Sequence, residues 1–438
     1  MRRAPADREF DLLVAGEINP DIVVAGDDIA PAFGQGERTV DRISMHIGSS
    51  SAITACAAAR LGLRVAFAGV VGDDAFGGWM LEALAGRGVD VSACRVDRSL
   101  ATGASVILTR PDDRATLTAV GAMSALTAND LPDGLLARAD ALVNVTGATV
   151  LREEHRRVPV RIYLETDPVL PQIEVAKGNP FYLDMLGAHT HHFTYGENIG
   201  QPDCGVPVTA RFPYRPTRPP VVLEWWSEPA VAPGPAFTTV ASWRQAGKDV
   251  EWRGETYTWS KHHEFLKIID LPRRTPQPLE LALAIRGQPG PSNGWVPRDQ
   301  EDAEAVRLLT AHGWRVTNAM PLSREIAPYR DYLRGSRGEL TVAKDQNVRL
   351  RSGWFSDRSA CYLAAGRPVI TQDTAFGKLV PTGAGLFAFR GLEDALAALD
   401  AVNADYAAHA AAARETAAGY FRAETVLAKL VEDCGLGG

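Results

Sequence analysis

Apolar residues in the first third of the chain form short runs separated by amphipathic stretches. FDLLVAG (residues 10–16) and RVAFAGVVG (64–72) are continuous apolar runs, which are typical of buried strands. Between them, residues 49–61 predict a helix that starts with a serine and ends just before a glycine. Residues 104–120 predict a hairpin, and DALVNVTG (140–147) predicts a further strand. This alternation favours an α/β sheet with crossover helices.

The remainder of the chain repeats this alternation after a proline-rich stretch. RFPYRPTRPP (211–220) cannot continue a helix or a central strand, and we interpret it as a connection between domains. VVLEWW (221–226) and FTTVASW (237–243) are expected to be strands. Residues 300–312 and 392–433 have helical patterns. The back half is therefore predicted to be a second α/β unit.

Composition narrows the class of protein. The 438 residues allow two or three domains, and a net charge of −7 argues against nucleic acid as a partner. The five cysteines show no C-x-x-C spacing, which favours a reduced, cytoplasmic protein without structural zinc. The N-terminus has no apolar signal segment, and no apolar run is long enough to span a membrane. We expect no metal ion and no integral membrane association.

The stretch GSSSAITACAAARLGLRVAFAGVVGDDAFG (48–77) resembles the front signature of the PfkB (ribokinase-like) carbohydrate kinases. The segment GEINPD places Asn19 and Asp21 where that family has an Asn-x-Asp pair. The resemblance covers about residues 10–140 and implies a ribokinase-like β-α-β sheet.

The resemblance also implies which residues bind the sugar. They are Asn19, Asp21, Gly48 and Ser49, whereas Ile53 replaces the asparagine that usually holds the sugar. The alternative for these glycines and polar residues is structural, namely helix–strand packing and helix capping.

A kinase of this family also needs a second signature, D-T-x-G-A-G-D, whose last Asp is the base. DTAFG (373–377) begins like it but continues differently, and PTGAGL (381–386) has Leu386 in the position of that Asp. Phosphoryl transfer needs a positioned base, and leucine cannot accept a proton. From this difference we expect the kinase-like segment to be inactive.

From about residue 143 onward the chain looks like a bacterial glycosyltransferase of the GT-B type. The stretches that carry the resemblance include RIYLETDP (161–168), HHFTYGENIG (191–200), SRGELTVAK (336–344) and SGWFSDRSACYLAAGRPVITQDTAF (352–376). The resemblance implies a nucleotide-sugar as co-substrate, an unknown acceptor and no firmly bound cofactor.

The transferase resemblance implies a donor site around one helix start. A helix N-terminus offers free N–H groups to a diphosphate, and hydroxyl or guanidinium groups nearby can add hydrogen bonds. The alternative is an ordinary strand–turn–helix unit in which Asp357 caps the helix. The predicted donor-binding residues are Ser336, Gly338, Glu339, Lys344, Ser356, Asp357, Arg358, Ser359 and Gly366.

The acid or base of a transferase is expected in the segment that lines the cleft between domains. Asp167, His192 and Glu197 are the predicted catalytic residues, because an inverting transferase needs a base near the acceptor hydroxyl. For Asp167 a turn role before Pro168 is the alternative. The histidine clusters at 189–192 and 262–263 lack a known metal-ligand spacing.

Together these patterns predict an α/β protein with two Rossmann-like domains arranged as in GT-B enzymes. The expected parts are a kinase-like segment (1–142), the rest of the acceptor-side domain (143–215) and a nucleotide-sugar domain (216–438). The predicted function is glycosyl transfer. The alternatives are a PfkB-family carbohydrate kinase, which would use ATP and Mg²⁺, and a sugar-binding protein without catalysis.

Overall fold

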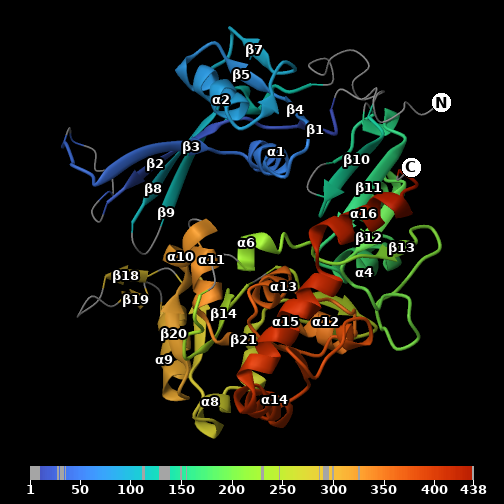
Figure 1. Ribbon diagram of the computed structural model, residues 1–438. Coiled ribbons are helices and arrows are strands. Elements are labelled where there is room, and N and C mark those ends of the chain that lie inside the picture. Colours follow the sequence, from blue (N-terminus) through green and yellow to red (C-terminus); the bar gives the residue numbers. More distant parts are fainter. Residues whose placement is uncertain are drawn as a thin grey trace. The chain divides into compact units, whose positions relative to one another are not determined.

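The computed structural model describes most of the chain between residues 10 and 436. Within that range, the residues not described are 27, 28, 30–33, 35, 111–113, 128–138, 148, 149, 154, 228–230, 246, 286, 290–294, 298, 299, 324 and 325. The chain folds into two compact units (Figure 1). Unit 1 is Met1–Ala139 with Glu153–Val158, and unit 2 is Asp140–Arg152 with Pro159–Gly438.

Unit 1 contains a parallel three-stranded sheet in the order β1-β4-β6. Its strands are β1 (Leu12–Ala15), β4 (Val65–Ala68) and β6 (Val89–Asp90), and helices α1 (Ser50–Arg60) and α2 (Ala75–Ala85) belong to the same unit. Ala52, Ala55 and Ala58 recur along one face of α1 and share a hydrophobic cluster with Val65 and Phe67 of β4. These small side chains let the helix lie close to the sheet.

A second sheet of unit 1 is four-stranded and mixed, in the order β3-β2-β8-β9. Strand β2 pairs antiparallel with β3 and parallel with β8, and β8 and β9 form the predicted hairpin. All six residues of β9 are exposed, so this edge of the sheet is open to solvent. The strands are β2 (Pro20–Ala25), β3 (Arg42–Ile47), β8 (Ala104–Thr109) and β9 (Arg114–Ala119).

The run predicted as one strand at residues 64–72 is two strands. Strand β4 pairs with β1, whereas β5 (Val70–Gly72) pairs with β7 (Arg95–Asp97) in a separate small sheet. The break falls at Gly69, where a Cβ atom would lie 2.8 Å from Cε1 of Phe67. The 3₁₀ turns of this unit are η2 (Gly121–Ser124) and η4 (His155–Arg157).

Unit 2 begins with a parallel four-stranded sheet in the order β10-β11-β12-β13. Leu430 and Cys434, at the C-terminal end of the chain, pack on Ile162 and Phe193 of this sheet. The proline-rich stretch supplies edge strand β13, because Pro216 has no N–H to give to a further strand. The elements are β10 (Ala141–Val145), β11 (Val160–Glu165), β12 (His191–Thr194), β13 (Tyr214–Pro216), α4 (Leu170–Ala176), α5 (Pro180–Gly187) and α16 (Ala423–Asp433).

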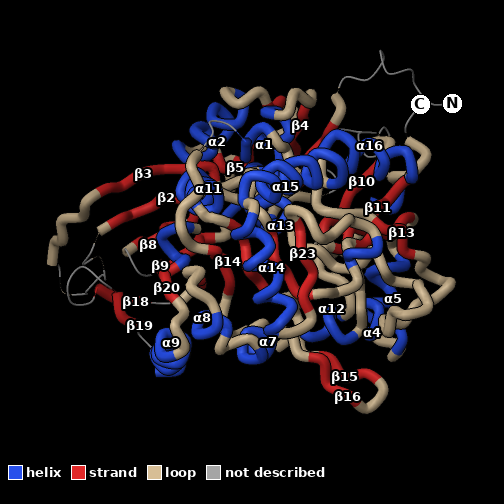
Figure 2. The backbone as a smooth tube through the Cα atoms, turned by 60° about the horizontal axis from the view of Figure 1, so that its bottom comes forward, coloured by secondary structure: helices blue, strands red, loops and turns tan. Residues whose placement is uncertain are grey.

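The larger sheet of unit 2 is six-stranded and wholly parallel, in the order β20-β17-β14-β21-β22-β23 (Figure 2). Val369 and Ile370 are consecutive in β22 but belong to different hydrophobic clusters, so both faces of the sheet are covered. The strand order reverses between β14 and β21, which is where open α/β sheets bind ligands. The strands are β14 (Phe237–Ala241), β17 (Leu279–Leu283), β20 (Arg315–Asn318), β21 (Gly338–Thr341), β22 (Val369–Gln372) and β23 (Leu386–Phe389).

Helices flank this sheet, and short hairpins extend the connections. They are α6 (Glu224–Ser227), α7 (His262–Lys267), α8 (Leu271–Arg274), α9 (Gln300–Ala311), α10 (Ala319–Leu322), α11 (Ile326–Gly335), α12 (Asp345–Arg349), α13 (Asp357–Ala364), η6 (Phe376–Lys378), α14 (Leu392–Ala404) and α15 (Tyr406–Tyr420), with hairpins β15 (Val250–Trp252)–β16 (Glu255–Tyr257) and β18 (Gly287–Pro289)–β19 (Trp295–Pro297). Among the described residues, every helix is too short or too polar to cross a bilayer.

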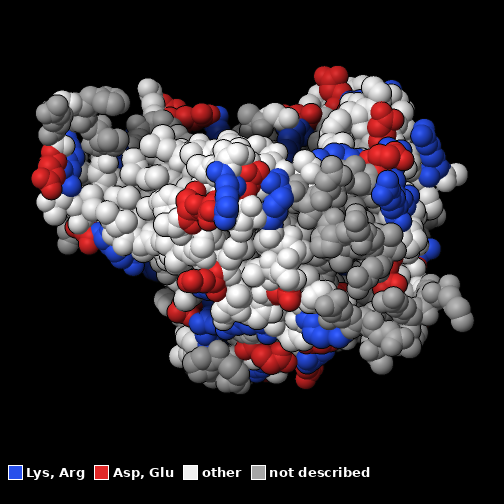
Figure 3. Space-filling model, turned by 90° about the horizontal axis from the view of Figure 1, so that it is seen from above, with Lys and Arg blue, Asp and Glu red and all other residues white. Residues whose placement is uncertain are grey.

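Two expectations about architecture need correction. Residues 221–226 do not form a strand: Val221 makes an isolated bridge with Arg422, and α6 begins at Glu224. The mixed α/β class with parallel sheets is confirmed, but the two-domain GT-B arrangement is not. On the face seen in Figure 3, acidic and basic side chains are interspersed over the described residues rather than gathered by sign.

Candidate functional site

The predicted sugar-binding residues Asn19, Asp21 and Gly48 lie together in unit 1, where β2 begins and β3 ends. Nδ2 of the buried Asn19 donates to Oδ1 of Asp21 at 3.3 Å. The backbone N–H of Gly48 donates to the carbonyl of Asn19 at 3.0 Å. A Cβ at Gly48 would lie 2.7 Å from Nδ2 of Asn19 and still closer to Oδ1 of Asp21. Only glycine allows this approach.

The polar atoms of this cluster are not fully used by the protein. Oδ1 of Asn19 is buried and, among the described residues, accepts no hydrogen bond. Burial raises the pKa of Asp21, and His46, Asn19 and Arg114 offset that rise only in part. An unpaired buried acceptor is costly, and a ligand hydroxyl that donates to it removes the cost. A carboxylate beside a free amide oxygen therefore suits a molecule with several hydroxyl groups.

Ser49 caps the N-terminus of helix α1. Its Oγ donates to the carbonyl of Glu17 at 2.6 Å and accepts from the N–H of Ala52 at 3.3 Å, which makes it the N-cap of α1. Its φ of 67° is unusual for a residue other than glycine. The side chain of Ile53 is 53% exposed. The hydroxyl predicted to hold a sugar is thus already engaged in starting the helix.

The VGDD segment is also built into the packing of unit 1. Asp74 caps α2 by accepting from the N–H of Gly77 at 2.9 Å, and it also accepts from the N–H of Thr102 at 2.8 Å. A Cβ at Gly77 would lie 2.9 Å from Oγ1 of Thr102. Helix capping and helix–strand contact therefore account for the spacing of this motif.

In unit 2, Glu339 and Arg358 form a buried ion pair between β21 and α13. Nε of Arg358 lies 2.6 Å from Oε1 of Glu339, which is 0% exposed. The other guanidinium nitrogens donate to the carbonyl of Val240 at 2.8 Å and to Oγ1 of Thr341 at 3.0 Å. Because these donors bind the protein itself, Arg358 ties the first turn of α13 to the sheet.

Lys344 is placed three residues after β21, near the point where the strand order reverses. Its Nζ lies 2.6 Å from Oδ1 of Asp167 and 3.1 Å from the centroid of the Trp259 ring. Lys261, over the ring of Trp354 at 5.6 Å, belongs to the same group of cations. Burial, together with repulsion from Arg358 and Lys344, lowers the pKa of Lys261 to about 7. The group can hold an anion, and the sequence offered no motif that singled out Lys261.

The other predicted donor-binding residues have local roles in the fold. Oγ of Ser336 donates to the carbonyl of Tyr332 at 2.8 Å, and Gly338 lies where a Cβ would be 2.5 Å from the carbonyl oxygen of Pro368. Ser356, not Asp357, occupies the N-cap of α13. Ser359 is buried, and its Oγ has no hydrogen-bond partner among the described residues. Gly366 ends the helix with a φ of 69°.

The structure does not assemble Asp167, His192 and Glu197 into one catalytic group. His192 is buried in β12, its Nε2 lies 2.9 Å from the carbonyl of Leu186, and burial lowers its pKa. Glu197 pairs with Arg218 at 2.6 Å, and Asp167 pairs with Lys344. Among the described residues no hydrogen bond or ion pair joins any two of the three. Instead, His192 packs in the core, and Asp167 and Glu197 each pair with a nearby cation.

The two segments that partly match the second kinase signature are engaged in the fold of unit 2. Leu386, after Gly383, Ala384 and Gly385, is 0% exposed in β23 and packs in a hydrophobic cluster. Asp373 is bound to Arg390 at 3.0 Å. Neither segment presents a free carboxylate. In the part of the chain that the structure describes, no three His, Cys, Asp or Glu side chains are grouped to hold a metal ion.

Comparison with known proteins identifies a family for part of the chain. Residues 10–155 match the pfkB family carbohydrate kinase. No curated protein matches the chain. This match agrees with the resemblance inferred from residues 10–140, and it contains the cluster of Asn19, Asp21 and Gly48.

Solved structures of carbohydrate kinases show a distant likeness. A putative ribokinase II from E. coli is 17% identical over 44% of this chain and 65% of its own, with a TM-score of 0.32. A fructokinase with bound ATP from Xylella fastidiosa is 16% identical over 42% and 60%, with a TM-score of 0.31. A putative ribokinase from Agrobacterium tumefaciens is 20% identical over 42% and 58%, with a TM-score of 0.31. This chain thus spans less than two thirds of each.

The glycosyltransferase prediction is wrong. The family found is a carbohydrate kinase, and the comparisons give no support to a transferase at residues 143–438 or to a nucleotide-sugar as co-substrate. The prediction of a transferase enzyme behind an inactive kinase-like segment is contradicted by the same family match. The error has a physical source: a doubly wound parallel sheet produces the same strand–turn–helix pattern in many unrelated proteins.

Proposed function

We propose that the chain is an ATP-dependent carbohydrate kinase whose sugar-binding part is residues 10–155. The observation that carries the proposal is the cluster of Asn19, Asp21 and Gly48 within the stretch that matches the pfkB family. Its half-buried carboxylate and its buried, unpaired amide oxygen are acceptors for the hydroxyl groups of a small sugar or nucleoside. The substrate class follows from this chemistry.

In such a kinase a sugar hydroxyl takes the γ-phosphoryl group of ATP, and Mg²⁺ neutralises the phosphate charge. The segment of Gly383, Ala384 and Gly385 leads into the buried Leu386, so it supplies no carboxylate for this chemistry. These residues do not fit the role of holding ATP and Mg²⁺ for transfer.

The test measures binding and turnover separately on the full chain. Isothermal titration with a panel of pentoses, hexoses and nucleosides detects binding, and ADP release with Mg²⁺ and ATP detects transfer. Asp21→Asn should weaken sugar binding roughly 10- to 100-fold, because hydrogen bonds to a charged group are worth about 1.5–3 kcal/mol. Asp90→Asn, an exposed carboxylate of the same unit, is the matched control.

The outcomes separate the parts of the proposal. Sugar-dependent ADP release that falls with Asp21→Asn but not with Asp90→Asn supports a kinase. Sugar binding without any ADP release would reject phosphoryl transfer while keeping the site. If no member of the panel binds, the cluster at Asp21 is not a sugar site.

A further inference from the structure

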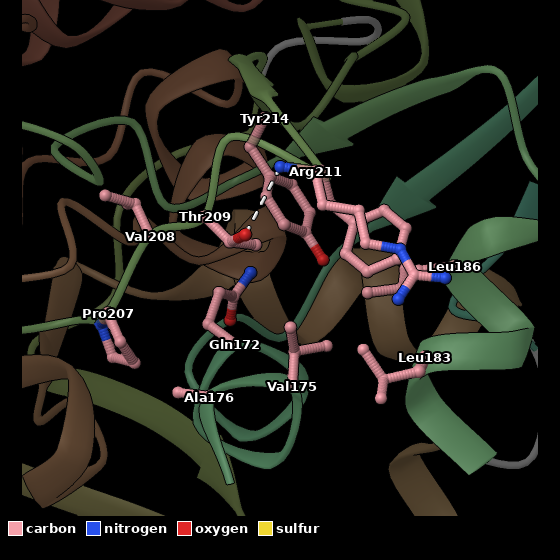
Figure 4. Close-up of a pocket in the computed structure, with 11 residues that line it drawn as sticks. Gln172, Val175, Ala176, Leu183, Leu186, Pro207, Val208, Thr209, Arg211 and Tyr214 are labelled. Atoms are coloured by element: carbon pink, nitrogen blue, oxygen red, sulfur yellow. Dashed lines mark hydrogen bonds between the residues drawn. The ribbon is translucent and has the colours of Figure 1, made fainter. Parts of the chain in front are cut away.

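Unit 2 contains a cavity that no part of the proposed kinase uses. It has a volume of about 280 Å³ and lies between α4, α5 and the segment that leads into β13 (Figure 4). Val175 and Leu183 supply apolar walls from the two helices, and Val208 closes the side formed by the loop. Its size is just below the range for small-molecule pockets, roughly 300–1,000 Å³, so only a small ligand would fit.

Two residues that carry hydroxyl groups line this cavity. Oη of Tyr214 is buried and, among the described residues, has no hydrogen-bond partner. Oγ1 of Thr209 accepts from the N–H of Arg211 at 3.2 Å, which leaves its own proton to donate. Figure 4 shows the ring of Tyr214 reaching from β13 toward Gln172 and Val175. The Thr209 hydroxyl can therefore donate to an acceptor inside the cavity, whereas Oη of Tyr214 lies buried behind the cavity surface.

The charge of the lining is positive. Arg211 is the charged residue among those that line the cavity, and its Cζ lies 5.1 Å from the centroid of the Phe212 ring. Behind the wall, the carboxyl of Glu165 accepts from Gln172 and Thr194 at 2.7 and 2.6 Å. Burial raises the pKa of Glu165 to about 8, so this carboxyl is mostly protonated at neutral pH and does not cancel the guanidinium.

We propose that this cavity binds a small monocarboxylate with an aromatic or branched aliphatic body. The carboxylate would pair with the guanidinium of Arg211 and accept from the hydroxyl of Thr209. The apolar body would lie against the helix side chains, including Val175. One guanidinium matches one negative charge, and the apolar walls disfavour a heavily hydrated anion such as phosphate.

The test compares two probes of equal size on the full chain by isothermal titration. We expect 3-phenylpropionate to bind with a dissociation constant of about 1 mM, a weak affinity appropriate to a small ligand. The neutral 3-phenylpropanamide should bind about tenfold more weakly, because it forms no ion pair with Arg211. A second acid, 4-methylpentanoate, tests whether a branched aliphatic body is accepted.

Three variants assign the binding to this cavity. Arg211→Gln should remove the preference for the acid over the amide, and Val175→Trp should abolish binding of both by filling the space. Lys177→Gln also removes one positive charge, at the C-cap of α4, but Lys177 does not line the cavity. This variant should therefore bind the acid and the amide as the unaltered chain does. Circular dichroism of each variant checks that it is folded. Because Arg211 is exposed, Arg211→Gln should fold normally, and it still tests the site if Val175→Trp does not fold.

The proposal is overturned if neither acid binds, or if acid and amide bind equally to the unaltered chain. It is also overturned if Arg211→Gln leaves the preference unchanged. Sugar binding at Asp21 in unit 1 is a separate measurement, so failure here leaves the proposed kinase untouched.

Discussion

The Asp21 cluster of unit 1 and the Glu339–Arg358 pair of unit 2 both contain a carboxylate beside a sheet, half-buried in Asp21 and buried in Glu339, but the two charges have different partners. Glu339 has a guanidinium at 2.6 Å, and that guanidinium makes further hydrogen bonds to Val240 and Thr341. Asp21 has an amide at 3.3 Å and, among the described residues, no ion pair. Its pKa is raised by burial.

The difference separates residues that hold the fold from residues that can bind a ligand. A buried charge that is paired stabilises the fold only while the pair is intact, and removal of one partner is strongly destabilising. A half-buried carboxylate that makes no ion pair is stabilised when a ligand donates hydrogen bonds to it. A sequence motif alone does not show whether a polar residue holds the fold or binds a ligand, because its hydrogen-bond and ion-pair partners are not known.

The largest effect is expected from breaking the pair in unit 2. Arg358→Met leaves Glu339 buried without its cation, which should lower the free energy of unfolding of unit 2 by about 3–5 kcal/mol. Urea unfolding followed by tryptophan fluorescence measures it. Trp79 is the single tryptophan of unit 1 among nine in the chain, so the signal reports mainly unit 2.

The matched control is Arg390→Met. Arg390 also pairs with a carboxylate, that of Asp373, but its side chain is 77% exposed, so loss of this pair should cost little stability. The double variant Glu339→Gln, Arg358→Met should recover part of the loss, because no uncompensated charge is left. If Arg358→Met and Arg390→Met have equal effects, the pair does not hold the fold and the comparison fails.

Glu165 sharpens the comparison because it is a buried carboxylate of unit 2 that lacks a cation. Its pKa is about 8 in the folded chain, against 4.5 for an unperturbed glutamate, so between these values the folded state binds the extra proton. The free energy of unfolding should therefore fall as pH rises from about 5 to 8, by at most about 1.4 kcal/mol per pH unit. Unfolding curves at several pH values measure this slope.

Glu165→Gln keeps an acceptor for Gln172 and Thr194 but cannot ionise, so it should flatten the slope over that pH range. Glu415→Gln, on an exposed position of α15, should leave the slope as it is. A slope that survives Glu165→Gln would mean that other groups cause it.

Gly48→Ala tests the close approach in unit 1. The added methyl group would meet Asn19 and Asp21, so we expect a loss of stability of about 1–3 kcal/mol and sugar binding at least about tenfold weaker. Gly78→Ala, in α2 with open space around its Cβ position, should instead be neutral or stabilising by about 0.5–1 kcal/mol. Thermal unfolding and titration measure both, and equal behaviour of the two variants would refute the close approach.

The smallest effect is expected at Ser49, where capping and sugar binding predict different results. Ser49→Ala loses the cap and should destabilise α1 by about 1 kcal/mol, whereas Ser49→Gly should cost only a few tenths because glycine tolerates the positive φ. Hydrogen exchange of the α1 amides measures this. Sugar affinity should stay the same in both variants, and a tenfold loss would return Ser49 to the sugar site.

Local chemistry makes some parts of the fold predictable from the sequence. The helix at 49–61 and its N-cap are predictable because serine is a preferred N-cap residue. The end of α13 is predictable because glycine, here Gly366, tolerates the positive φ that ends many helices. The family of residues 10–155 is also predictable, since its motif is local. Strand β14 is predictable at FTTVASW from its aromatic and β-branched residues.

Contacts between distant residues are not predictable in the same way. Residues 221–226 have a strand-like composition, yet Val221 pairs with the segment at Arg422, and the helix α6 follows. His192 has the chemistry of a base but lies in the core against Tyr163 and Phe212. Nothing in the sequence around Asp167 indicates that its partner is Lys344.

The sequence by itself determined the alternation of strands and helices, the caps of α1 and the kinase family of the first third, because each depends on residues a few positions apart. Only the tertiary structure decided which polar residues are paired. It joined Glu339 to Arg358, left Asp21 without an ion pair among the described residues, and buried the hydroxyl of Tyr214. The physical reason is that the cost of a buried charge or hydroxyl depends on neighbours that come from elsewhere in the chain.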